Sequence, residues 1–161
     1  MLFVFVAIVA FFVNFEGNNN YIVKQVISNV EIREYSKQLY ASYLPENIND
    51  RNNSFRNVAG FIFGGNKQNE KIAMTYPVVI KLHNKNEMAF IMPNEYTLQN
   101  IPQPNSNKIK IYEETSKIRA AIRYSGYSSS KKEQNKIEEL KTILNKNNIV
   151  FENDFEVLVY N

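Results

Sequence analysis

The sequence contains no cysteine and a single histidine, His83, among its 161 residues. Without thiols the chain cannot form disulfides, thiolate nucleophiles, iron–sulfur clusters, Cys-ligated zinc sites or covalent c-type haem links. A single histidine is too few for a His-rich metal site, and it leaves little scope for a Ser-His-Asp triad. We therefore predict no metal site and no enzyme built on these groups.

The chain also has little net charge. The chain has 19 basic and 16 acidic residues, a formal charge of +3. This charge is small and evenly spread, whereas nucleic-acid binding needs a concentrated basic surface. The densest basic spot, Lys131-Lys132, opens a polar segment and is typical of a solvated face. We expect no nucleic-acid partner.

Hydrophobic residues make up 44% of the chain, enough for one domain with a real core. The one long apolar run is "LFVFVAIVAFFV", from Leu2 to Val13. It is shorter than the about 20 residues that a membrane-spanning helix needs. It has the length of a signal-peptide core, although no basic residue precedes it and no A-x-A pattern follows. We favour a hydrophobic targeting or anchor segment over residues 1–17, which predicts a secretory or membrane-tethered protein, and a folded domain over 18–161.

The first half of this domain alternates strand and helix patterns. Residues 21–28 and 30–35 have period two and meet at a turn, and residues 39–44 continue extended. The residues Phe55, Val58, Ala59 and Ile62 fall on one helix face. We expect Asp50 to cap this helix and Gly64-Gly65 to end it, because glycine accepts a left-handed conformation.

The second half repeats the order of elements. Residues 74–82 and 87–92 predict a hairpin, and residues 108–112 and 117–125 predict two further strands. Ser130 and Glu133 have capping-box spacing before an apolar helical stripe. The last residues, 155–160, form a closing strand. Together the elements predict an α+β fold: a strongly curled antiparallel sheet with two helices packed on it.

The segment "GFIFGGNKQNEK", from residue 60, contains two glycines followed by lysines, as a phosphate-binding loop would. A Walker loop, however, has its glycines after a strand and before a helix. Here they follow a helix and precede a strand, so helix-terminal amides do not point at an anion. We interpret Gly64-Gly65 as a helix end and a turn.

The same region resembles a known family. "FIFGGNKQNEKIAMTYPV", residues 61 to 78, is similar to the central signature of the SOUL haem-binding protein family, aromatic-Ile-x-Gly-x-Asn followed by Lys-Ile-x-Met-Thr-x-Pro-Val. Four other blocks resemble family motifs in the same order, covering the chain from Tyr21 onward. They are "YIVKQVISNVEIREY", "AFIMPNEY" with the later Pro102 and Pro104, "IRAAIRYSGYSS" and "FEVLVY".

This resemblance implies a curled eight-stranded antiparallel sheet, a distorted barrel, with two helices in two pseudo-duplicated βαββ halves. It also implies non-covalent, non-catalytic binding or transport of haem or another tetrapyrrole, in a shallow apolar site beside the first helix. Two positions depart from the family pattern. Glu34 replaces a histidine that serves some members as a proposed haem ligand, and residues 151–154 replace a longer loop that flanks the ligand site.

A tetrapyrrole site needs an apolar surface and cations for the propionates. The apolar helix face is expected to pack mainly on the sheet, with Ala59 and Phe63 nearer its edge and better placed for ligand contact. The cofactor-binding residues predicted in this way are Phe55, Arg56, Ala59, Phe63, Lys67 and Lys71.

Other side chains leave alternatives open. Arg119 and Arg123 share a strand face, where they could hold ligand carboxylates or pair with a glutamate of a neighbouring strand. His83 is expected to be exposed at a hairpin tip, and it is a candidate iron ligand because a free imidazole takes iron. The rival functions are a ligand- or protein-binding module of the same fold that has lost haem, and an enzyme that acts on a small molecule.

Overall fold

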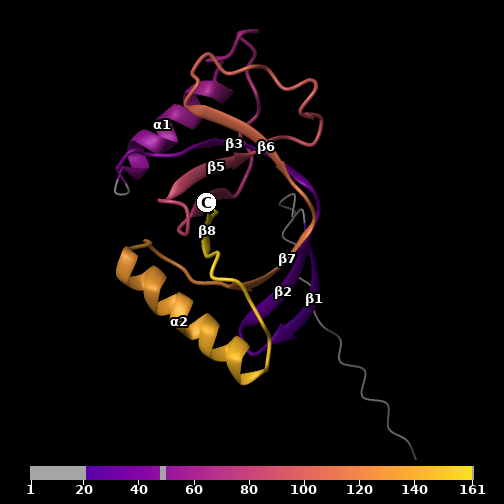
Figure 1. Ribbon diagram of the computed structural model, residues 1–161, viewed down its shortest axis with the longest axis vertical. Coiled ribbons are helices and arrows are strands. Elements are labelled where there is room, and N and C mark those ends of the chain that lie inside the picture. The colour runs from indigo at the N-terminus through magenta and orange to yellow at the C-terminus, as the bar shows by residue number, and fades with distance from the viewer. Residues whose placement is uncertain (1–20, 48–49, 161) are drawn as a thin grey trace, which may run out of the picture.

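The computed structural model describes residues 21–47 and 50–160 (Figure 1). The predicted N-terminal segment, 1–17, lies outside these residues and stays a prediction. The elements are β1 (Tyr21–Ile27), β2 (Val30–Tyr35), β3 (Gln38–Tyr43), α1 (Arg51–Ile62), β4 (Val78–Lys81), β5 (Glu87–Ile91), β6 (Ile109–Glu114), β7 (Lys117–Ile122), α2 (Ser130–Lys146) and β8 (Glu156–Val159).

The strands form two antiparallel sheets, one in the order β1-β2-β7 and the other in the order β6-β3-β5-β4-β8. Three chain segments pass from one sheet to the other; the longest runs from β7 through α2 to β8, and the other two are short crossings. β2 continues into β3, and β6 continues into β7, with only two residues between the strands in each case. The two short crossings lie side by side, because Tyr35 pairs with Lys117 and Gln38 pairs with Glu114. Figure 1 shows β6 and β7 as one curved band that runs from beside α1 toward α2.

The larger hydrophobic core lies between α1 and the five-stranded sheet. Phe61 and Ile62 of α1 are 2% and 0% exposed and pack with alternate residues of the strands, such as Phe90. The helix begins where predicted, since the Asp50 side chain accepts a hydrogen bond from the backbone N–H of Asn53. It ends before Gly64, whose φ of 108° is left-handed.

The smaller core lies between α2 and the three-stranded sheet. Leu140 and Leu144 of α2 pack on Val30 of β2. The capping residue of α2 is Ser129, one position before the predicted Ser130, because the Ser129 side chain accepts from the backbone N–H of Lys132. The predicted capping box is therefore wrong. The carboxylate of Glu133 bonds to Arg51 instead of turning back to the helix end.

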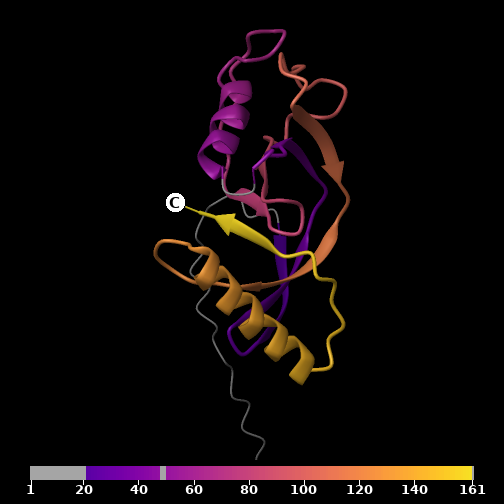
Figure 2. The same ribbon diagram turned by 60° about the vertical axis from the view of Figure 1, so that its left-hand side comes forward.

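The α+β class and the curled antiparallel sheet are confirmed: residues 21–47 and 50–160 contain two helices and eight strands. The barrel is not closed, because β1 and β8 are the outer strands of separate sheets and do not pair with each other. The pseudo-duplication of the two halves stays a prediction. Figure 2 shows α1 and α2 at opposite ends of the molecule, with the strands between them. Within the described part of the chain, neither helix has the length and apolar character required to cross a bilayer.

Candidate functional site

A large open cavity of about 2420 Å³ lies between α2, the three-stranded sheet and the last segment of the chain. Its volume exceeds the roughly 300 to 1,000 Å³ of ordinary small-molecule sites. We call it the α2 cleft. Apolar side chains supply one wall, and they come from three places in the sequence. They are Ile32, Ala120 and Ile122 of the sheet, Ile137, Leu140 and Leu144 of α2, and Ile149, Phe151 and Phe155 of the following segment.

This apolar wall is incompletely packed. Leu140 and Leu144 are buried, but most of their partners in the smaller core are only partly buried. Phe151 and Phe155 meet edge to face, with ring centroids 6.5 Å apart. In the short loop between them and α2, Val150 is 98% exposed. Apolar side chains of this segment thus border open space instead of a filled core.

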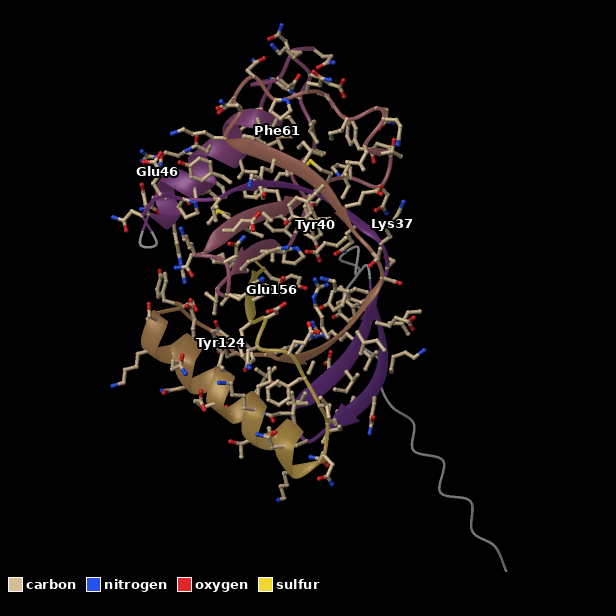
Figure 3. The ribbon with its side chains drawn as sticks, in the orientation of Figure 1. Lys37, Tyr40, Glu46, Phe61, Tyr124 and Glu156 are labelled. Carbon is tan, nitrogen blue, oxygen red and sulfur yellow. The ribbon has the colours of Figure 1, made fainter. Side chains whose placement is uncertain are left out.

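A paired set of charges lines another part of the cleft, where the two sheets face each other. Lys81 bonds to Glu114, and Glu114 also accepts from Arg119 at 2.8 Å. Arg119 in turn lies 3.4 Å from Glu156. We call these four residues the ion cluster. It contains two positive and two negative groups, so its members neutralise one another. Figure 3 shows Glu156 and the nearby Tyr40 in the middle of the molecule.

The pKa values in this cluster follow from burial and pairing. Burial alone would raise the pKa of Glu114, but the hydrogen bond from Lys81 and the charges of Lys81 and Arg119 outweigh it and lower that pKa. Burial would likewise lower the pKa of Lys81, but its hydrogen bond to Glu114 and the neighbouring charges raise it. Both groups are therefore charged across the neutral range.

Five tyrosines border a smaller cavity beside the ion cluster. Its volume is about 20 Å³, which is room for one water molecule. Burial raises the pKa of Tyr35 and Tyr40, and it raises the pKa of Tyr160 to about 12. These phenols are protonated at neutral pH. The tyrosines are Tyr21, Tyr35, Tyr40, Tyr76 and Tyr160.

Two cationic side chains lie along the cleft. Each is partly exposed to solvent, where it can donate further hydrogen bonds. The Arg123 side chain is 71% exposed; its Nη2 bonds to the Tyr21 hydroxyl at 3.1 Å and lies 3.6 Å from Glu31. Arg123 thus pairs with a glutamate of the neighbouring strand, which is one of the two alternatives left open by the sequence, whereas Arg119 pairs within the ion cluster. Lys136 of α2, 29% exposed, bonds to Glu139 at 2.6 Å. A guanidinium has five N–H donors, so Arg123 can also bind a carboxylate.

His83 follows β4 and lines the α2 cleft. Its side chain is exposed, as the sequence predicts, and its Nδ1 lies 3.3 Å from the carbonyl oxygen of Phe155. No three His, Asp or Glu side chains gather into a metal-binding group within residues 21–47 and 50–160.

The residues predicted to bind the cofactor lie on and beyond α1, away from both cavities. Ala59 is 7% exposed and packs in the larger core, so the expectation that it lies at the edge is wrong. Phe55 is 39% exposed and its ring packs on Phe90, with centroids 5.3 Å apart. Phe63 is 61% exposed. Arg56 is exposed on the same helix.

The two predicted lysines are held by the loop that follows α1. Lys71 forms a backbone bridge with Phe63, and the backbone N–H of Lys67 donates to Gln103. Both side chains are exposed. Neither of the two cavities is lined by any of the six residues predicted on α1 and this loop. A ligand site on α1 stays a prediction.

Asn66 organises that loop and was not among the predicted residues. It is 1% exposed; its Nδ2 donates to the carbonyls of Phe61 and Glu70, and its Oδ1 accepts from the N–H of Glu70. This asparagine is the last residue of the Gly-x-Asn element that carries the resemblance. The signature therefore includes a residue that fixes the end of α1, a structural role visible only once the loop is folded.

A curled sheet with two helices, opening into a large and partly apolar cleft, defines the molecule as a small α+β domain with room for a ligand. The sequence model of the SOUL heme-binding protein matches residues 17–161. The chain therefore belongs to the SOUL heme-binding protein family. A search of curated proteins finds no match to this sequence.

Proposed function

We propose that this protein binds haem or a related tetrapyrrole non-covalently, in the α2 cleft, and carries it without catalysing a reaction. The observation behind the proposal is the incompletely packed apolar wall of Ile122, Ile137 and Phe151, which borders open space. Apolar surface left out of a core is costly in water, and a flat hydrophobic ligand would cover it.

The residues of the cleft fit the chemistry of an iron tetrapyrrole. The wall offers an apolar surface for the macrocycle, and Arg123 and Lys136 offer cations for two propionates. When bound, the iron would supply a Lewis acid, and the protein's part would be to hold the ring and limit its contact with water. The openness of the cleft favours loading and release, as a carrier requires.

A non-catalytic role is supported by the ion cluster. Lys81, Glu114, Arg119 and Glu156 are titratable groups that come together at the cleft, and each is paired with another. A general acid or base needs a free proton site within reach of a substrate, and these four charges are committed to one another.

The test is a titration of the full chain with hemin, followed in the Soret band, and with metal-free protoporphyrin IX, followed by its fluorescence. We expect saturable binding of one ligand per chain for both. Ile137→Glu places a carboxylate on the apolar wall and should weaken both affinities by about tenfold or more, because burying an unpaired charge costs over about 1.4 kcal/mol.

The matched control is Phe63→Glu, on the exposed predicted site of α1. If Phe63→Glu weakens binding and Ile137→Glu does not, the ligand lies beside α1 and the location proposed above is wrong. If neither ligand saturates the protein, tetrapyrrole binding itself is refuted. The remaining alternative is then a binding module of the same fold without haem, a reading favoured by the 67% exposed Ile22 and 70% exposed Ile118 on the three-stranded sheet.

A further inference from the structure

One imidazole lies at the apolar wall of the α2 cleft, held there through the backbone. His83 is exposed and lines the cleft. The Phe155 carbonyl accepts a hydrogen bond from the N–H of Leu82 at 3.0 Å and also faces His83 Nδ1 at 3.3 Å. The side chain of the same Phe155 belongs to the apolar wall. His83 is thus anchored to the residue that a bound macrocycle would contact.

The contact with Phe155 decides which ring nitrogen can bind a metal. A carbonyl oxygen only accepts hydrogen bonds, so Nδ1 must carry the proton to bond with it. In a neutral imidazole the lone pair then lies on Nε2. Metal-binding histidines commonly have this arrangement, with one ring nitrogen on the metal and the other donating to a backbone carbonyl or a carboxylate.

Several other side chains of types that hold haem iron are less suited. Haem ligands in proteins are histidine, cysteine, methionine and tyrosine, and the chain has no cysteine. Met92 is 3% exposed and packs in the larger core. Met74 packs against that core as well. Burial raises the pKa of the Tyr35 and Tyr160 phenols, which keeps them protonated, and iron binds the phenolate.

We infer that His83 Nε2 is the protein's axial ligand to the iron of the bound tetrapyrrole, with Phe155 orienting the imidazole. This inference rests on the proposed function. It also differs from a ligand just before Tyr35, where Glu34 stands in this chain. Because the sequence has one histidine, each chain can supply one imidazole to the iron.

The experiment compares the full chain with His83→Ala, and uses Tyr160→Phe as the control for a tyrosine ligand. Each protein is titrated with hemin and, separately, with protoporphyrin IX, which has no iron to ligate. We expect His83→Ala to shift the Soret band and the ferric EPR signal and to weaken hemin binding by about tenfold or more. Protoporphyrin IX binding should be unchanged. Added imidazole should restore the spectrum of His83→Ala, and Tyr160→Phe should resemble the unmodified protein.

Unchanged Soret and EPR spectra in His83→Ala would overturn the inference and leave the proposed function intact, provided that protoporphyrin IX still binds. A spectrum altered by Tyr160→Phe instead would give the ligand role to that tyrosine. If hemin binds through His83 but Ile137→Glu has no effect, the imidazole is a surface ligand outside the cleft, and the inference fails. If the unmodified protein binds neither hemin nor protoporphyrin IX, the proposed function itself is refuted.

Discussion

Arg51 and Glu133 form a two-pronged ion pair, with Nη1–Oε1 and Nη2–Oε2 distances of 2.8 and 2.9 Å. The pair joins the first residue of α1 to the first turn of α2, so it ties together the two ends of the molecule. Glu133 is 5% exposed and also accepts a hydrogen bond from Ser128. The hydrogen bond from Arg51 is the main reason that the pKa of Glu133 lies below its ordinary value.

Removing Arg51 should destabilise the fold. Arg51→Ala leaves a buried carboxylate with only Ser128 to bind it, and we expect the free energy of unfolding to fall by about 2 to 3 kcal/mol. Lys108→Ala is the matched control, because Lys108 also pairs with a glutamate, Glu46, but on the open surface. Its cost should stay within about 0.5 kcal/mol. Urea unfolding measures both. Equal losses would mean that the Arg51 pair is worth no more than a surface pair.

Acid should weaken the protein through Glu133 and Glu114, whose pKa values are both lowered in the folded state. Between the lowered value and the ordinary value of 4.5 the unfolded chain binds more protons, so stability falls with falling pH. The contribution is complete above pH 4.5 and is lost below it as the folded carboxylates protonate. Urea midpoints from pH 7 to pH 3 measure this dependence. Arg51→Ala should show a shallower loss, and an unchanged slope would remove Glu133 from the explanation.

The elements of the fold could be predicted because their signals are local. Strand alternation, the helix face of Val58 and Ile62 and the Asp50 cap depend on neighbours in sequence, and the structure has each of them. The Ser130–Glu133 box was misleading because a carboxylate three positions after a serine can also serve a distant partner. Arg51, 82 positions away, bonds to Glu133. Nothing in the spacing of the sequence indicates that contact.

Replacing either of two glycines in one segment by alanine should change the stability of the protein, in opposite directions. A Cβ on Gly65 would lie 2.5 Å from the Gly60 carbonyl oxygen, so Gly65→Ala must displace backbone and should cost about 1 kcal/mol or more. A Cβ on Gly60 meets nothing within 4 Å, and Gly60→Ala should stabilise α1 by about 0.5 to 1 kcal/mol. Thermal unfolding of both variants tests the helix-end interpretation of this segment. If Gly65→Ala is neutral, the tight approach of the loop to the helix is not needed.

Replacing Lys81 should lower the free energy of unfolding, because its charge is buried and paired. Lys81 is 7% exposed, bonds to Glu114 and lies over the ring of Tyr112, with Nζ 4.9 Å from the centroid. Lys81→Met removes a charge from the ion cluster, and we expect a loss of about 3 kcal/mol. The double variant Lys81→Met with Glu114→Gln should lose less than the sum of the two single losses. Additive losses in a double-mutant cycle would show that the two charges act independently.

The candidate site was harder to predict than the fold, because it depends on what is missing from a surface. Ile137, Leu140 and Ile143 have the spacing of an ordinary packed helix face, and only the structure shows that the sheet below them does not fill the space. The sequence contains only a weak indication of the ion cluster. Lys81 is the last residue of β4, whose four residues are all buried, so a charge at this position requires a buried partner.

The two short crossings, from β2 to β3 and from β6 to β7, lie side by side at one bend between the sheets. Each crossing is two residues long, and the pairs Tyr35–Lys117 and Gln38–Glu114 hold them together on both sides of the bend. The bend lies between the lobe that carries α1 and the lobe that carries α2, which the chain from α2 to β8 also connects. Glu114 and Arg119 sit on either side of the bend, and the bond between Arg51 and Glu133 joins the lobes through their helices. These ion pairs therefore cross between the parts of the molecule that carry α1 and α2, and moving those parts away from each other would have to break both.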